Sequence, residues 1–76
     1  MKEPVDNLLL LTIDDEESVR SSVAAFFEDC GFIVIQACDG QEGINKITSL
    51  HPDVVITDLR MPNMDGLEVV DAVKRL

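Results

Sequence analysis

The feature that most constrains the fold is an apolar run from Leu8 to Ile13, in which Thr12 is the one polar residue. Strands with one wet face alternate apolar and polar residues, whereas strands covered on both faces read as continuous apolar runs. The run therefore predicts a central strand that is buried on both sides. Such a strand needs a sheet with other elements packed against both of its faces.

The rest of the chain alternates between helix-like and strand-like segments. A first helix is predicted from an apolar stripe at helical spacing, and Gly31 is expected to end it. The stripe comprises Val19, Val23, Phe26, Phe27 and Cys30. A second helix is expected to end at His51-Pro52, because a residue before proline disfavours helical geometry. The predicted strands cover about 8–13, 33–37 and 54–57, and the predicted helices about 16–30, 40–50 and 66–76.

This βαβαβα order predicts how the strands are arranged. Strands joined by crossover helices run parallel, and the helices then cover the two faces of the sheet. We therefore expect a three-layer α/β/α fold. In open sheets of this kind, ligands bind outside the carboxyl ends of the strands, where the strand order reverses.

Composition excludes several classes of protein. The chain of 76 residues has 15 Asp and Glu against 6 Lys and Arg, a net charge of -9, which argues against direct contact with nucleic acid. Hydrophobic residues make up 46%, too many for a disordered acidic tail. No membrane span or signal peptide is recognisable, so a cytoplasmic protein is expected. Cys30 and Cys38 are not in a CxxC motif and have no histidine near them, so neither a zinc site nor a redox motif is predicted.

Acidic residues follow two of the three predicted strands. Asp14 and Asp15, with Glu16 and Glu17 after them, follow the first strand, and Asp58 follows the third. Each group has a simpler interpretation: residues 14–17 could form an acidic first helical turn, and Asp58 could be a loop aspartate. Because adjacent parallel strands would bring these ends together, a shared cation is the better interpretation. Oxygen ligands without His or Cys suit Mg²⁺.

The chemistry that remains open to such a site is narrow. The sequence has no glycine-rich phosphate loop, no GxSxG motif and no Cys/His pairing, which leaves an aspartate as the nucleophile. A carboxylate beside Mg²⁺ can accept a phosphoryl group and form an aspartyl phosphate. Asp39-Gly40 and Asp65-Gly66 are predicted to be caps and turns, and His51 a surface residue.

Three stretches, residues 8–16, 37–43 and 53–66, resemble the receiver domain of two-component response regulators. The resemblance covers essentially the whole chain and implies the flavodoxin-like fold with strand order 2-1-3-4-5. It also implies that Asp58 is the phosphoacceptor, that Asp14 and Asp15 hold Mg²⁺ directly or through water, and that the backbone carbonyl of Arg60 completes the ligands.

The same resemblance implies the partners of such a domain. The phosphoryl donor would be a phosphohistidine on a sensor histidine kinase or a phosphotransfer protein, and an output domain would lie elsewhere in the parent chain. The domain itself would be a phosphoacceptor for phosphorelay signalling and not an enzyme.

A complete receiver has five strands and five helices, so the 76 residues are expected to form the N-terminal half, truncated after the third βα unit. The expected half lacks the hydroxyl residue and the lysine that contact the phosphoryl group. A non-phosphorylating interaction fragment is therefore an alternative, with a homodimer through an exposed third strand. A haloacid-dehalogenase-like phosphatase is a weaker one, because Asp14-Asp15-Glu16-Glu17 does not fit its DxDx[TV] motif.

Overall fold

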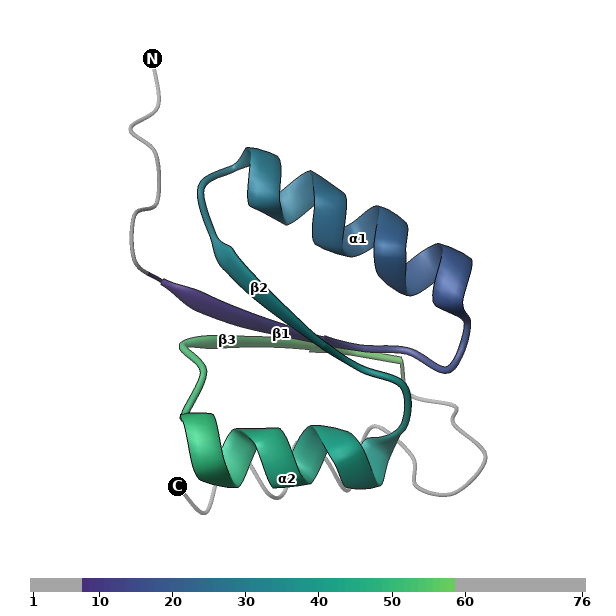
Figure 1. The fold of residues 1–76 in the computed structure, drawn as a ribbon, viewed down its shortest axis with the longest axis vertical. Coiled ribbons are helices and arrows are strands. Elements are labelled where there is room, and N and C mark those ends of the chain that lie inside the picture. The colour runs from purple at the N-terminus through teal and green to yellow at the C-terminus, as the bar shows by residue number, and fades with distance from the viewer. Residues whose placement is uncertain (1–7, 59–76) are drawn as a thin grey trace.

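The computed structural model describes residues 8–58, which form three strands and two helices in the order βαβαβ (Figure 1). The elements are β1 (Leu9–Ile13), α1 (Glu17–Asp29), β2 (Ile33–Ala37), α2 (Gly40–Leu50) and β3 (Val54–Thr57). Strand β1 and helix α1 are slightly shorter than predicted, and the other three elements have the predicted bounds. The helix predicted at 66–76 lies outside the described residues.

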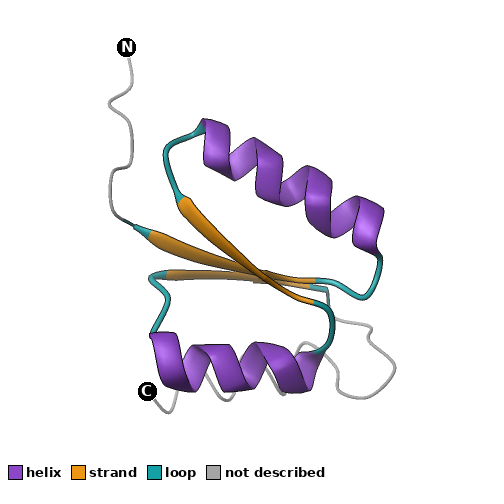
Figure 2. Cartoon of the chain, in the orientation of Figure 1, coloured by secondary structure: helices purple, strands orange, loops and turns teal. Residues whose placement is uncertain are grey.

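The strands form one parallel sheet in the order β2-β1-β3 (Figure 2). In this register Ile13, the last residue of β1, lies opposite Ala37 of β2 and Thr57 of β3. All three strands therefore end at the same edge of the sheet. The parallel sheet and its order 2-1-3 confirm the predicted fold class. Among these strands β3 lies at an edge, and pairing of β3 with a second chain stays a prediction.

Strand β1 is buried on both faces, as its apolar run predicts. Leu10 and Leu11 are 0% exposed, although their side chains point to opposite faces of the sheet. Helix α1 covers one face and α2 the other (Figure 1). The core cluster on the α2 side comprises Leu11, Ile13, Ala37 and Ile47, with Ile35, Ile44 and Val55 packed against it. Neither α1 nor α2 is long and apolar enough to cross a membrane.

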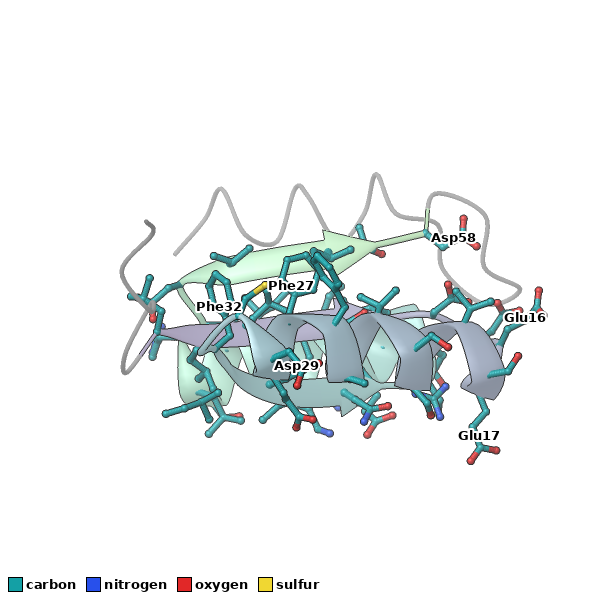
Figure 3. The ribbon with its side chains drawn as sticks, turned by 90° about the horizontal axis from the view of Figure 1, so that it is seen from above. Glu16, Glu17, Phe27, Asp29, Phe32 and Asp58 are labelled. Carbon is teal, nitrogen blue, oxygen red and sulfur yellow. The ribbon has the colours of Figure 1, made fainter. Side chains whose placement is uncertain are left out.

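Gly31 ends α1 as predicted, and it does so in a left-handed conformation with φ 103°. Its N–H donates to the carbonyl of Glu28 at 3.0 Å, and the N–H of Phe32 donates to the carbonyl of Phe27 at 3.1 Å. This pair of bonds is the Schellman motif. The Phe27 and Phe32 rings meet edge to face at 5.7 Å, which supplies the apolar contact that accompanies the motif (Figure 3).

The apolar stripe predicted for α1 is partly wrong. The buried residue of this helix is Ala24, with Val23 and Phe27 half-buried beside it, whereas Phe26 is 62% exposed. Val19 and Cys30 are exposed as well. Phe26 lies two residues beyond Ala24, which places it about 200° around the helix axis and away from the sheet. The small Ala24 side chain sits where the helix meets the strands.

Helix α2 begins at a cap, as predicted for Asp39. The Asp39 carboxylate accepts from the N–H of Glu42 at 2.8 Å, and the Glu42 carboxylate accepts from the N–H of Cys38 at 2.8 Å. Lys46 pairs with Glu42 at 3.0 Å and also donates to the carbonyl of Gln36. The Cys38 N–H, followed by the Cys38 thiol and Lys46, lowers the pKa of Glu42 to about 2.

The lowered pKa of Glu42 predicts a pH-dependent contribution to stability. The contribution is complete above the unfolded pKa, near 4.5, and is lost as the pH falls toward 2. Because 39% of the Glu42 side chain is exposed, solvent screening reduces the contribution to about 1 kcal/mol. We expect Glu42→Gln to lower the free energy of unfolding by about this amount at pH 7. Urea unfolding at a series of pH values tests this, and a difference from wild type that did not shrink between pH 5 and 2 would contradict it.

Gly43 allows α2 to approach β1 closely. A Cβ at this position would lie 2.4 Å from Cδ1 and 3.0 Å from Cγ1 of Ile13. Ile13 is 1% exposed and belongs to the core cluster, so its side chain has little room to turn.

We expect Gly43→Ala to destabilise the fold by about 1 kcal/mol, because overpacking outweighs the higher helix propensity of alanine. The matched test is Ile13→Val, which removes Cδ1. In denaturant unfolding, Gly43→Ala should cost less in the Ile13→Val background than in wild type. Equal costs in both backgrounds would show that the two side chains do not compete for space.

Candidate metal centre

The candidate site lies where β1 and β3 end. The parallel register continues past Ile13, whose carbonyl accepts from the N–H of Asp58 at 3.2 Å. Asp14 and Asp58 are thus the first residues after two paired strands. Figure 3 shows Asp58 at the end of the sheet where Glu16 leads into α1.

The structure brings three of the predicted site residues together. Asp14, Asp15 and Asp58 each offer a carboxylate oxygen, and these oxygens lie within 4.8 Å of one another. Asp14 is half-buried, whereas Asp15 and Asp58 are exposed. Oxygens that share an octahedral Mg²⁺ lie about 3 to 4 Å apart, so small side-chain rotations suffice to close the set around one ion. The donor atoms and their spacing fit Mg²⁺, and the roles of these residues stay predictions.

Asp14 is held more firmly than its neighbours. Its N–H donates to the carbonyl of Ala37 at 3.2 Å, and its Oδ1 accepts from the N–H of Glu16 at 2.9 Å. The second bond makes an Asx turn between β1 and α1. The backbone and one carboxylate oxygen of Asp14 are therefore fixed by hydrogen bonds at the end of β1.

The interpretation of residues 14–17 as an acidic first helical turn applies to Glu17 alone. Helix α1 begins at Glu17, and Glu16 at the N-cap makes no side-chain capping bond. Asp14 and Asp15 precede the helix. Their carboxylates are not used as helix caps, which leaves them at the carboxyl edge of the sheet.

Other predicted residues of this region lie beyond the part of the chain that the structure describes. These are Arg60, Asp65 and Gly66. Two predicted residues outside the acidic cluster lie in the described part of the chain, and both predictions are confirmed. Asp39 caps α2, and His51 is an exposed residue at the end of α2.

Sequence reasoning missed two residues whose hydrogen bonds fix this part of the fold, Asp53 at the strand ends opposite the site and Arg20 beside the site. Asp53 accepts from the N–H of Leu9 and donates its own N–H to the Leu9 carbonyl, both at 2.8 Å, so it aligns the starts of β1 and β3. Arg20 donates to the backbone carbonyl of Asp14 at 2.8 Å. The available signal for Arg20 was its position one helical turn after Glu16, as a single cation beside an acidic run.

Comparison with known proteins gives a consistent result. Residues 10–76 match the response regulator receiver domain family. Protein PilG of Pseudomonas aeruginosa is 31% identical over 97% of this chain and 55% of its own length. The transcriptional regulatory protein LiaR of Bacillus subtilis is 43% identical over 87% of this chain and 32% of its own length. Chemotaxis protein CheY4 of Vibrio cholerae superposes with a TM-score of 0.84 at 38% identity, over 90% of this chain and 57% of that one.

A parallel sheet between two helices, with acidic residues at the strand ends, is the architecture of a flavodoxin-like signalling domain. The chain belongs to the response regulator receiver domain family of two-component systems. This result decides against the haloacid-dehalogenase-like alternative. The chain spans about half the length of PilG and of the CheY4 chain, and about a third of LiaR.

Proposed function

We propose that this chain accepts a phosphoryl group on the Asp58 carboxylate, in the cytoplasm, from a phosphohistidine of a sensor histidine kinase or phosphotransfer protein. The observation that carries the proposal is the convergence of Asp14, Asp15 and Asp58 within 4.8 Å at the carboxyl edge of a receiver fold. Such a cluster repels itself unless a cation compensates it. Mg²⁺ is the cation that best suits these ligands, and the Arg60 carbonyl is the proposed further ligand.

In this proposal Asp58 is both the phosphoacceptor and a metal ligand, and Asp14 and Asp15 are metal ligands. Asp58 is exposed, so an oxygen of its side chain can reach a phosphoryl group on another protein. In the transfer, a bond forms between this oxygen and phosphorus while the bond from phosphorus to the histidine nitrogen breaks, and the imidazole leaves with the electron pair and takes up a proton. Asp14 and Asp15 hold the cation together with Asp58. When bound, Mg²⁺ neutralises the charge on the transferring oxygens.

The readout of phosphorylation would lie outside the described residues. LiaR is named as a transcriptional regulatory protein and CqsS of Vibrio cholerae as a sensor kinase/phosphatase, and this chain matches 32% and 10% of their lengths. The same receiver fold therefore occurs beside different output regions. We propose that the phosphorylated chain signals by changing its contacts with an output domain or partner protein and not by catalysing a reaction.

Mg²⁺ binding is the first testable consequence. We expect Asp15→Asn and Asp58→Asn each to weaken Mg²⁺ binding about tenfold or more, because each removes a charged ligand. Calorimetric titration measures the affinity. Asp29→Asn is the matched control, since it removes an exposed carboxylate at the far end of α1. Unchanged affinity in both site variants would show that the cluster is not a metal site.

Phosphorylation at Asp58 is the second consequence. Incubation with acetyl phosphate and Mg²⁺ should add one phosphoryl group, detected by intact mass, and both Asp58→Asn and EDTA should abolish it. Asp53→Asn, which changes a carboxylate at the start of β3, should still be modified. Modification that persisted in Asp58→Asn would contradict the assignment, and no modification of the wild-type chain would favour the interaction-fragment alternative.

A further inference from the structure

The guanidinium of Arg20 joins the acidic loop, residues 14–16, to strand β2. Nη1 donates to the backbone carbonyl of Asp14 at 2.8 Å, and Nε donates to the side-chain oxygen of Gln36 at 3.1 Å. Arg20 is half-buried, and its own N–H donates to the carbonyl of Glu16 at 2.9 Å. From the first turn of α1, the Arg20 side chain thus links the loop after β1 to strand β2.

The hydrogen bond from Arg20 to the Asp14 carbonyl fixes the orientation of the whole peptide unit between Asp14 and Asp15. A peptide unit is planar, so the carbonyl of Asp14 and the N–H of Asp15 lie in one rigid plane. Fixing the direction of that carbonyl also fixes the direction in which the chain enters Asp15. Asp14 is already held through its N–H and its Oδ1. Arg20 adds the constraint that reaches Asp15, whose exposed side chain makes no hydrogen bond within residues 8–58 that would hold it in the acidic cluster.

The acceptors that Arg20 uses are neutral. Within residues 8–58 the guanidinium donates to a carbonyl oxygen and an amide oxygen and not to a carboxylate. A guanidinium paired with Asp14 or Asp15 would compete with a cation for the same oxygens. As a positive charge close to the cluster, Arg20 by itself opposes cation binding. The charge of Arg20 therefore lowers metal affinity, whereas its effect on the geometry of the loop would raise it.

We propose that Arg20 is a positioning residue for the metal centre, holding the Asp14–Asp15 peptide so that both carboxylates can share one divalent cation. The inference rests on the proposed Mg²⁺ site. Gln36 supports it by orienting the guanidinium from β2.

The sign of the change in Mg²⁺ affinity tests this inference. We expect Arg20→Gln to bind Mg²⁺ about tenfold more weakly, the size typical for loss of a residue that orients metal ligands. Arg20→Lys keeps the charge but lacks the planar fork, so it should also bind more weakly. If Arg20 acted through its charge alone, Arg20→Gln would bind more tightly and Arg20→Lys would equal wild type. Either result would overturn the proposal.

Two further measurements separate positioning from general stability. Lys46→Gln removes the same charge from α2, where Lys46 pairs with Glu42 and bonds the backbone of Gln36 but not its side chain, and it should leave Mg²⁺ affinity within about twofold. In the cation-free chain, ¹⁵N relaxation should show a more mobile Asp15 amide in Arg20→Gln than in wild type. An equally rigid amide would overturn the inference. Should Arg20→Gln fail to fold, Gln36→Ala replaces it, with an expected loss of about threefold.

The outcomes for the site and for Arg20 remain distinguishable. If wild type binds Mg²⁺, Asp15→Asn loses binding and Arg20→Gln does not, the proposed function stands and the role of Arg20 is wrong. If wild type does not bind Mg²⁺, both fail. Weaker binding in Arg20→Gln and in Asp15→Asn, with Lys46→Gln unchanged, supports both.

Discussion

The parallel pairing of β1 with both of its neighbours is the constraint on which the rest depends. It places β1 in the middle, so its residues are buried alternately under α1 and α2. The same pairing sets Ile13 opposite Thr57 and makes Asp58 donate to the Ile13 carbonyl. The hydrophobic core and the acidic cluster are therefore two results of one register. A slip of one residue would exchange the residues of the strand that face α1 with those that face α2, and it would separate the carboxylates.

The predictable part of the structure is the part set by patterns of two to seven residues. The apolar run of β1, the glycine after α1 and the aspartate before α2 each have a local physical meaning, and each prediction is confirmed. The convergence of Asp14 and Asp58 could be predicted too, because the alternation of helices and strands already implies parallel strand ends that meet. The predicted topology thus brings together two residues that are more than forty positions apart in the sequence.

What could not be predicted depends on how whole elements pack. The stripe on α1 has enough apolar residues to face the sheet, yet the helix is rotated so that Ala24 is buried and Phe26 is not. Helical periodicity defines a stripe, but the contact distance between helix and sheet decides which part of it is covered. Gly43 acts similarly on the other face, since its missing Cβ leaves space for Ile13. The bonds made by Arg20 and Asp53 join residues whose sequence separation gives no periodic signal.

The way in which the acidic loop is held connects stability with function. A cluster of carboxylates could be stabilised most simply by salt bridges, but cations paired with it would occupy the oxygens that a metal ion needs. In residues 8–58 the loop is instead held by bonds to neutral groups: the Ala37 carbonyl, the Glu16 N–H and, through Arg20, the Asp14 carbonyl. The ion pair of Lys46 with Glu42 lies on α2. Arg20 holds the acidic loop through the backbone carbonyl of Asp14 and not through a carboxylate, so its hydrogen bonds do not compete with a divalent cation for the carboxylate oxygens.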